Sequence, residues 1–351
     1  DLIDAVLKLI IVMMIAYSPI DKLIFYGALL FLLKILTFLF NFLYCNYHYI
    51  ESRLCTIWDK SMLKEMGKFT GWASVGNFSY VFYTQGLNIL LNLFCGPIVN
   101  AARGLAVQVE AAMAQFTNSI QTAINPQIIK SYSSNDNARM NMLVYASSRY
   151  CFYLMFLLSM PVILGTDFVL GLWLGDYPAH TVNFIRLTLI CTLIDTLTNP
   201  LYIANLATGK VAIYNKSLAI LSLSFIPIIF WGIKLTRLPE IVFILNIMRN
   251  IIGLGVRMFI FRYQLRVGIR EYVKNVLLRI IPVVLFASIL PVFLYGMIGS
   301  DTIISFVSIC MVAVISILMT VLCIGLNKME RDFITFQCKN KFANLTRTYI
   351  H

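Results

Sequence analysis

Charged residues, histidines and paired cysteines are all scarce in this sequence of 351 residues. Asp, Glu, Lys and Arg make up 13% of the chain, whereas a soluble domain carries about 25%. The three histidines, His48, His180 and His351, are far apart, and none of the eight cysteines belongs to a CxxC pair. The composition therefore excludes an ordinary soluble domain, and the spacing suggests no metal site.

Catalytic motifs are also missing. The sequence has no GxSxG motif, no Walker-type phosphate loop and no loop long enough for the acidic motifs of membrane glycosyltransferases. We therefore expect neither enzyme activity nor a cofactor. The net charge of +12 does not indicate nucleic-acid binding, because the basic residues fall in short gaps between apolar runs. Such a distribution fits membrane topology and anionic lipid headgroups.

Long apolar runs are what the sequence has in abundance. Hydrophobic residues form 60% of the chain, and the mean hydropathy is +0.81. Because a membrane helix needs about 20 apolar residues, these runs predict an all-α polytopic membrane protein with about ten transmembrane helices. The expected helices span residues 2–18, 22–44, 69–94, 98–124, 142–164, 182–204, 211–233, 241–261, 276–298 and 303–326. Residues 168–174 are expected to extend the fifth helix or to form an interfacial turn.

Proline-containing dipeptides mark the boundaries of several expected helices. Proline lacks an N–H and clashes with the preceding turn, so it ends or kinks a helix. Broken helices line substrate sites in some transporters, although a plain kink is the commoner case. The expected helix ends are at Gly96-Pro97 and Asn125-Pro126, and an internal hinge is expected at Asn199-Pro200.

Lysine and arginine are distributed unevenly over alternate gaps between the expected helices. One set of gaps, counted with the adjoining helix ends, holds eighteen of these residues, and the other set holds four. Short loops with an excess of Lys and Arg stay in the cytoplasm. The pattern therefore predicts a multi-pass protein with both ends of this chain on the cytoplasmic side.

The fourth expected helix carries a polar stripe that cannot face lipid at acceptable cost. Arg103, Glu110, Thr117, Gln121 and Asn125 fall within about a quarter of its circumference at 100° per residue. Ionisable groups in a membrane helix usually face a bundle interior or a water-filled cavity. The stripe therefore predicts a helix that lines a polar lumen. The alternative is a buried pair of Arg103 and Glu110 that only joins helices.

Two further helices have polar faces. On the third, Asn77, Asn88 and Asn92 share one side, which indicates a hydrated cavity or, for any single Asn, a contact between helices. On the sixth, Asp195 lies near the middle of the span, as Glu110 does on the fourth. Two acids at similar depth fit a coupling site for Na⁺ or H⁺. The alternative is that each acid is neutralised by a neighbouring arginine.

Several cations lie at or inside expected helices. Arginine binds phosphate through a bidentate fork, so Arg103, Arg149 and Arg186 are candidates for holding an anionic substrate in one cavity. Arg149 and Lys8 could instead snorkel to the membrane interface. Arg257, in the eighth expected helix, is expected to snorkel inward.

A resemblance to a known family rests on four segments: QGLNILLNLFCGPIVNAARGLAVQV, QTAINPQIIKSYSS, VLGLWLGDYPAHTVNFIRL and ATGKVAIYN. They resemble the polysaccharide-biosynthesis branch of the multidrug/oligosaccharidyl-lipid/polysaccharide exporter superfamily, and more closely the Wzx-type O-antigen and capsule flippases. The resemblance covers residues 2–326, and the strings NAARG and NPQIIKSY are its most specific parts.

The resemblance implies a transporter with two helical lobes around a solvated, often cationic cavity. Such proteins move undecaprenyl-pyrophosphate-linked oligosaccharide, the repeat unit of lipopolysaccharide O-antigen or capsule, across the bacterial inner membrane by alternating access. The implied partners are this lipid-linked oligosaccharide, membrane lipids, polysaccharide polymerase and other glycan-assembly proteins.

Roles for the polar residues follow from this resemblance. Arg103, helped by Arg149 or Arg186, would hold the pyrophosphate. Glu110 and Asp195 would pair with those arginines or bind the coupling cation. Water and sugar hydroxyls would contact the four amides Asn77, Asn88, Gln121 and Asn125.

The resemblance also implies a domain organisation with a MATE/MOP-like lobe plus two helices from the other lobe. About four N-terminal helices of the family pattern are missing, so we expect the chain to be a fragment. The implied parts are the last two helices of the N-terminal lobe (1–44), a cytoplasmic inter-lobe linker (45–68), the C-terminal six-helix lobe (69–262), two additional transmembrane helices (263–326) and a basic cytoplasmic tail (327–351).

Three other functions compete with the flippase. A cation-coupled multidrug antiporter of the same fold would have an acidic, aromatic cavity with little need for arginine. A non-transporting membrane scaffold would need no cavity at all. A glycan-transfer enzyme would need a soluble acidic motif, which the sequence lacks.

Overall fold

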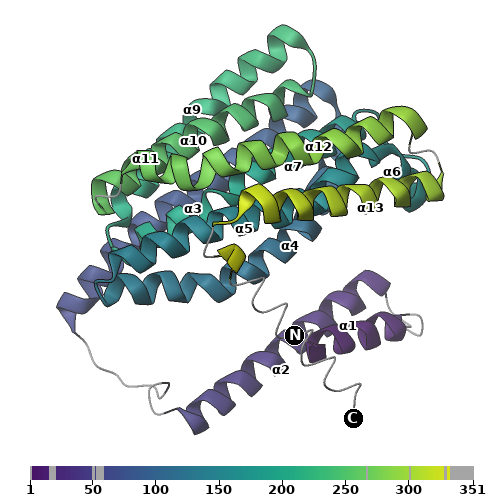
Figure 1. The fold of residues 1–351 in the computed structure, drawn as a ribbon. Coiled ribbons are helices and arrows are strands. Elements are labelled where there is room, and N and C mark those ends of the chain that lie inside the picture. Colours follow the sequence, from purple (N-terminus) through teal and green to yellow (C-terminus); the bar gives the residue numbers. More distant parts are fainter. Residues whose placement is uncertain are drawn as a thin grey trace, which may run out of the picture. The chain divides into compact units, whose positions relative to one another are not determined.

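The described part of the chain is built from helices. The computed structural model describes residues 2–15, 21–49, 52, 59–265, 268–299, 302–327 and 330–332. Every regular element within these ranges is a helix, and none is a strand (Figure 1). The all-α prediction is therefore confirmed.

The chain divides into two compact units, Asp1–Lys64 and Glu65–His351. In the first unit, helices α1 (Leu2–Ile15) and α2 (Lys22–His48) pack against each other. The first expected helix runs to residue 18, and its last three residues lie outside the described part.

The expected loop 45–68 is shorter than predicted. Helix α2 continues to His48, and the long helix α3 begins at Lys60. Much of the loop between them lies outside the described residues. Helix α3 begins earlier than predicted because the lysines of residues 60–68 have good helix propensity and extend the apolar helix that follows them. Most of the tail 327–351 is likewise not described.

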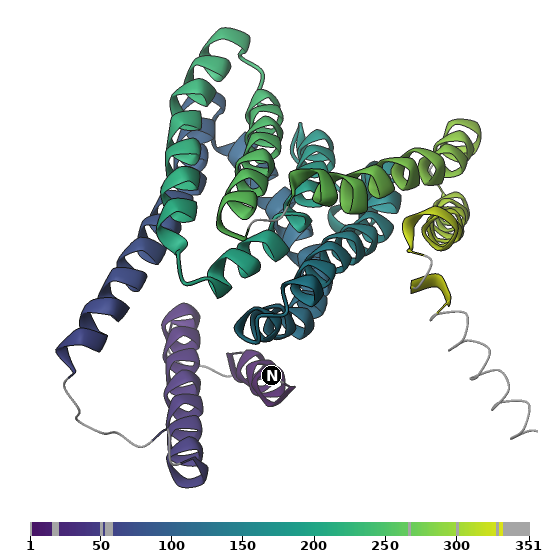
Figure 2. The same cartoon turned by 60° about the vertical axis from the view of Figure 1, so that its left-hand side comes forward.

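From Lys60 onward, the described residues form eleven helices and two π-helical turns (Figure 2). Short loops join most of them. Their bounds are α3 (Lys60–Cys95), α4 (Pro97–Ser133), α5 (Asn137–Leu164), α6 (Thr166–Leu174), α7 (Thr181–Thr196), α8 (Asn199–Ala207), α9 (Val211–Thr236), α10 (Ile241–Leu265), α11 (Ile269–Tyr272), η2 (Val273–Leu277), α12 (Leu278–Ile298), α13 (Ile303–Thr320) and η3 (Val321–Gly325).

Seven helical segments of the described chain are long and apolar enough to cross a membrane. They are α2, α5, α7 with α8, α9, α10, α11 through α12, and α13 with η3. Three of the ten expected helices do not meet this standard: α1 has 14 residues, and α3 and α4 are long but less apolar. The polar faces of α3 and α4 lower their hydropathy. A membrane-crossing role for these three helices therefore stays a prediction.

The proline signals had different outcomes. Helix α3 ends at Cys95 and α4 begins at Pro97, with Gly96 between them at φ +85°, a conformation that favours glycine. The sixth expected helix is broken as predicted, because α7 ends at Thr196 and α8 begins at Asn199. The predicted stop at Asn125-Pro126 is wrong: α4 continues through Pro126 to Ser133. Proline suits helical φ and removes only one donor, so a packed helix can accommodate it.

Helix α4 is the centre of the second unit and packs against α5, α7 and α8. Ala102 and Ala106, one turn apart, are fully buried and let neighbouring helices approach closely. Large side chains such as Leu91, Ile128 and Leu189 are also completely buried around it. This packing holds the polar stripe of α4 at a fixed orientation relative to α7 and α8.

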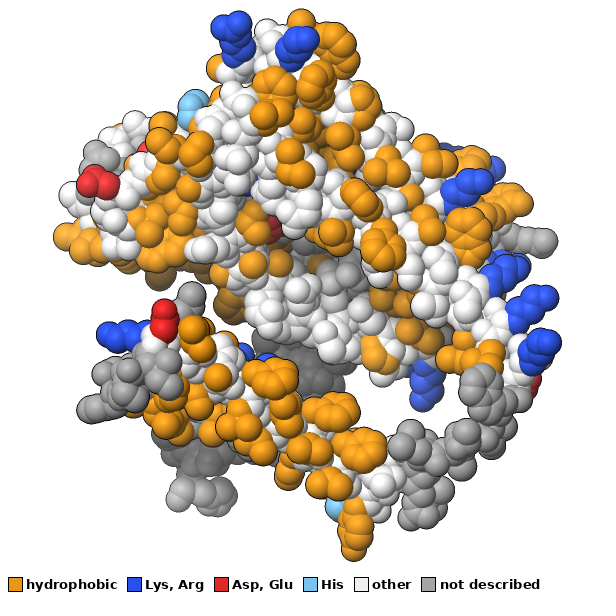
Figure 3. Space-filling model, turned by 180° about the vertical axis from the view of Figure 1, so that it is seen from behind, with side chains coloured by type: hydrophobic (Ala, Val, Ile, Leu, Met, Phe, Trp, Pro, Cys, Tyr) orange, Lys and Arg blue, Asp and Glu red, His pale blue; other side chains and the backbone are white. Residues whose placement is uncertain are grey.

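The outward faces of several helices are apolar. On α12, the side chains of Leu285, Phe286, Ile289 and Phe293 are more than half exposed. Figure 3 shows many hydrophobic side chains spread over the visible face among other side chains and backbone, with most Lys and Arg side chains near its margins. Apolar surface this extensive needs a cover of lipid or protein, in agreement with the seven candidate membrane spans.

A contact outside the candidate spans joins the start of α7 to the start of α10. His180 Nδ1 lies 2.5 Å from Glu240 Oε1, and Asn183 Nδ2 donates to the same oxygen at 3.2 Å. Burial by itself would raise the pKa of Glu240, but the hydrogen bonds from His180 and Asn183 outweigh burial and lower it. The folded protein therefore favours the ionised form of Glu240.

We expect Glu240→Gln to lower the melting temperature at pH 7, and this difference from wild type to vanish in acid. A carboxyl whose pKa is lower in the folded than in the unfolded state stabilises the fold above its unfolded pKa, about 4.5. That stabilisation is lost as the pH falls through the lower, folded pKa. Thermal unfolding of both proteins from pH 7 to pH 3 measures the effect. A difference in melting temperature that persists unchanged at pH 3 would contradict this role.

Candidate functional site

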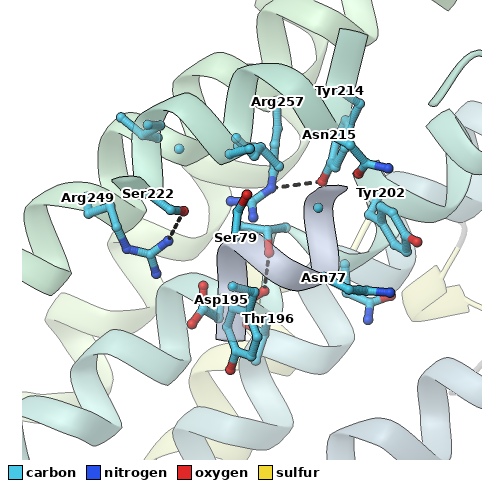
Figure 4. A pocket seen from close by; sticks show the side chains of 18 of the residues that line it. Asn77, Ser79, Asp195, Thr196, Tyr202, Tyr214, Asn215, Ser222, Arg249 and Arg257 are labelled. Carbon is cyan, nitrogen blue, oxygen red and sulfur yellow. Dashed lines mark hydrogen bonds between the residues drawn. The ribbon is translucent and has the colours of Figure 1, made fainter. Parts of the chain in front are cut away.

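A polar cavity lies in the second unit among helices α3, α4, α7, α8, α9 and α10. It has two adjoining chambers of about 630 Å³ and about 730 Å³. Tyr80, Glu110, Asp195 and Arg249 line both chambers. Figure 4 shows side chains of the first chamber, with Asp195 from α7, Arg249 and Arg257 from α10, and Asn77 from α3 around the same space.

Six of the nine residues proposed from the sequence line this cavity. Gln121 is buried at its wall, whereas Asn77 is exposed. Three helices supply the six residues: Asn77 and Gln121 in the first chamber, Asn88 and Arg103 in the second, and Glu110 and Asp195 in both. The structure thus brings the polar stripes of α3, α4 and α7 together, and a binding role for each residue stays a prediction.

Arg103 is the cation of the cavity with no protein partner in the described part of the chain. Its guanidinium takes part in none of the hydrogen bonds or ion pairs of the described residues. The Arg103 side chain is half-buried. Glu110 and Asp195 also form no ion pair among the described residues. The buried Arg103–Glu110 pair, which was the alternative to a lumen, is therefore not formed. All five donor hydrogens of Arg103 are available to water or a ligand.

Arg249 is held in place by neutral groups. Its Nε donates to Asn246 Oδ1 at 3.1 Å, its Nη2 to Asn250 Oδ1 at 2.6 Å and its Nη1 to Ser222 Oγ at 3.2 Å. The guanidinium also lies 4.4 Å from the centre of the Tyr83 ring, within the range of a cation–π interaction. Because none of these partners is charged, Arg249 keeps its positive charge uncompensated by direct contact.

Arg257 lines the first chamber beside aromatic residues. Its Nε donates to the Tyr214 hydroxyl at 2.9 Å, and the Tyr214 ring lies 5.4 Å from the Tyr202 ring (Figure 4). The next residue along α9, Asn215, donates to the carbonyl of Trp72 at 3.0 Å and so ties α9 to α3. In the structure the Arg257 side chain lies at the chamber wall, and the expectation that it snorkels inward stays a prediction.

Three of the proposed residues lie elsewhere. Arg149 is 1% exposed and forms an ion pair with Glu330 and a hydrogen bond of 2.7 Å to the Asn275 carbonyl. Arg186 donates to Asp167 Oδ2 at 3.1 Å and to the Ile163 carbonyl at 2.9 Å. Neither arginine lines the two chambers and each forms an ion pair, so the structure does not bring them to Arg103, and their proposed role in substrate binding stays a prediction.

Asn125 is the third residue outside the cavity. It follows Gln121 on α4, at a point of the helix that no longer borders either chamber. Its Oδ1 atom is buried and has no hydrogen-bond partner in the described structure. A stripe that follows 100° per residue drifts slowly around the helix and runs past the end of any chamber. Asn125 is thus a half-buried residue of the bundle that lines neither chamber, and its proposed contact with the substrate stays a prediction.

The sequence contained a signal for the two arginines that were not proposed. Asn246, Arg249, Asn250, Gly253 and Arg257 recur at spacings of three, one, three and four, so they share one face of α10. All but Asn250 line a chamber, and Asn250 holds Arg249. The sequence analysis considered only Arg257 from this face, as a residue that snorkels, so the polar face of α10 was not predicted as part of the cavity.

The cavity combines three arginines, two carboxylates, several amides and four tyrosines. The arginines can bind an anion by bidentate hydrogen bonds. The tyrosine rings can stack on the faces of sugar rings, and the amides can form hydrogen bonds with sugar hydroxyl groups. No nucleophile–base pair is evident among its residues, and no cluster of His, Cys, Asp and Glu in the described chain could hold a metal. A scan against protein-family models, a search of curated proteins and a search of solved structures found no match. The cavity must therefore be interpreted from its own chemistry.

Proposed function

We propose that this chain belongs to a membrane transporter that flips undecaprenyl-pyrophosphate-linked oligosaccharide across the bacterial inner membrane by alternating access. The observation that carries the proposal is Arg103, which has no hydrogen-bond or ion-pair partner among the described residues and lies in a polar cavity that candidate membrane-spanning helices help to line. Arg249 and Arg257 add two positive charges to the same cavity. This set of side chains is the one expected in a binding site for a lipid headgroup that carries both phosphate and sugar.

The division of labour differs from the one inferred from the sequence. Arg103 would bind the pyrophosphate, and Arg249 and Arg257 take the supporting place that had been given to Arg149 and Arg186. Amides such as Asn77, Asn88 and Gln121, together with the tyrosines, would contact the sugars. Glu110 and Asp195 would limit the net positive charge, so that the substrate can leave as well as enter.

Ligand-induced stabilisation tests the proposed substrate class. We expect undecaprenyl pyrophosphate to raise the melting temperature of the purified protein, and undecaprenol at the same concentration to leave it unchanged. A ligand that binds only the folded state stabilises it by RT ln(1 + [L]/Kd), about 2.7 kcal/mol at one hundred times Kd. Equal shifts with both lipids would show that the phosphates are not recognised, and the proposal would then fail.

A cation-coupled antiporter of the same fold is the second candidate. It is favoured by one observation: Glu110 and Asp195 line both chambers, and neither forms an ion pair with an arginine of the described chain. Acids placed in this way could bind Na⁺ or H⁺ in exchange for a cationic substrate.

The double variant Glu110→Gln/Asp195→Asn separates the two candidates. For a flippase we expect binding of undecaprenyl pyrophosphate to persist, because the arginines remain and two repulsive carboxylates are gone. For an antiporter we expect uptake of a cationic dye into proteoliposomes, driven by a Na⁺ or H⁺ gradient, to fall at least tenfold relative to wild type. Loss of lipid binding together with loss of dye transport would favour the antiporter.

A further inference from the structure

The second unit contains three places where helical hydrogen bonding is interrupted and a backbone carbonyl is bound by a side chain. Two are the π-helical turns η2 and η3, in which hydrogen bonds shift from i+4 to i+5, as in the 3.1 Å bond from Leu326 N to the Val321 carbonyl. The third is the break between α7 and α8. The bound carbonyls and their donors are Asn275 with Arg149, Gly325 with Tyr153, and Leu197 with Tyr272.

Arg149 is the centre of this arrangement. Its Nη1 donates to the Asn275 carbonyl of η2, and its Nη2 pairs with the carboxylate of Glu330, just beyond η3. The second oxygen of Glu330 accepts from the Asn327 amide at 2.7 Å. One turn along α5, the Tyr153 hydroxyl donates to the Gly325 carbonyl at 3.2 Å. Helix α5 thus holds the base of α12 and the end of α13 together through polar contacts.

The same cluster reaches the break beside the cavity. Tyr272 is fully buried next to η2, and its hydroxyl lies 3.1 Å from the Leu197 carbonyl and 3.1 Å from the hydroxyl of Ser148. Ser148 directly precedes Arg149 in α5. Leu197 lies two residues after Asp195, a residue of both chambers. A continuous chain of contacts therefore runs from Glu330 to the hinge of a cavity-lining helix.

We propose that Glu330 and Arg149 form a latch that sets the geometry of the α7–α8 hinge. With the latch closed, α11 and η2 are held on α5, and Tyr272 holds the Leu197 carbonyl. With the latch open, Tyr272 loses its fixed position, and the hinge beside Asp195 is free to change its angle. The latch lies outside the cavity and uses none of its residues, so it would regulate the cavity at a distance.

The inference does not depend on the proposed substrate, because its test measures backbone opening and not transport. Coupling through a chain of contacts has to be demonstrated by perturbing one end and observing the other. The variant is Glu330→Gln in the otherwise complete chain, which removes the charge but keeps an acceptor for Arg149. Amide hydrogen exchange, measured by mass spectrometry in detergent micelles, follows residues 195–199 and 321–327.

We expect Glu330→Gln to speed exchange at least fivefold in both segments. Tyr272→Phe, which keeps the ring and removes only the hydroxyl, should speed exchange at 195–199 and leave 321–327 unchanged. The matched control is Asp167→Asn, which breaks the ion pair with Arg186 at a distance from the latch and should alter neither segment.

Two results would overturn the latch. If Glu330→Gln speeds exchange only at 321–327, the contact is a local tie and does not reach the hinge. If Tyr272→Phe leaves 195–199 as slow as in wild type, the Leu197 contact does not hold the hinge. Because Tyr272→Phe changes a single hydroxyl, it keeps the test valid even where Glu330→Gln disturbs folding.

Discussion

Replacing Arg149 with methionine is expected to lower the free energy of unfolding by about 3–5 kcal/mol, the cost of removing one partner of a buried ion pair. The guanidinium is almost fully buried, and the variant would leave Glu330 Oε1 and the Asn275 carbonyl without the donor that Arg149 supplies. Methionine fills a similar volume with a flexible apolar chain, so the effect isolates the lost charge and hydrogen bonds. Thermal or denaturant unfolding in detergent measures the loss.

Arg186→Met is the matched control for this prediction. Arg186 also forms an ion pair, but its side chain is 33% exposed and that of Asp167 is 55% exposed. Exposed pairs contribute less than about 1 kcal/mol, so we expect a loss several times smaller than for Arg149→Met. The double variant Arg149→Met/Glu330→Gln should recover part of the loss, because no unpaired carboxylate remains. Similar losses for the two single variants would refute the structural role of Arg149.

Replacing Arg103 with alanine is expected to reduce translocation of lipid-linked oligosaccharide by about tenfold to one hundredfold. Hydrogen bonds to charged groups contribute about 1.5–3 kcal/mol, and every 1.4 kcal/mol corresponds to a factor of ten. Since Arg103 has no partner in the described chain, its loss should leave stability nearly unchanged. Flipping of a fluorescent lipid-linked oligosaccharide in proteoliposomes containing the full-length protein measures the rate.

Two comparisons sharpen the Arg103 prediction. Arg103→Lys keeps the charge but loses the bidentate fork, so it should fall between wild type and Arg103→Ala. Arg186→Ala removes the same charge outside the cavity and should transport at the wild-type rate. If Arg103→Ala transports as fast as Arg186→Ala, Arg103 does not bind the substrate.

Much of the architecture could be predicted from the sequence, because apolar length and helical periodicity are local properties. The runs of apolar residues located the helices of the second unit, although α3 begins well before and α4 ends well after the predicted bounds, and Gly96-Pro97 and Asn199-Pro200 marked two real interruptions. A local signal failed where a proline was taken to end a helix. Pro126 lies inside α4, because its conformation suits a helix and one missing donor is tolerated.

The polar stripes were also visible in the sequence, since residues three and four apart share a helical face. Arg103, Glu110 and Asp195 indeed line one cavity with Asn77, Asn88 and Gln121. The same reasoning could not separate Arg103 from Arg149, because both are arginines inside apolar helices. Arg103 has no hydrogen-bond or ion-pair partner among the described residues, whereas Arg149 binds the Asn275 carbonyl of η2 and the Glu330 carboxylate beyond η3.

By itself, then, the sequence determined the helical class, the approximate helix positions and which polar residues share a face, since each depends on neighbours along one helix. Only the tertiary structure decided which faces meet. It turned α10 with Arg249 and Arg257 towards the cavity, and it turned α5 with Arg149 towards η2 and Glu330. The physical reason is that helical periodicity fixes angles around each axis, whereas the rotation of one helix against another is set by packing among residues far apart in the chain.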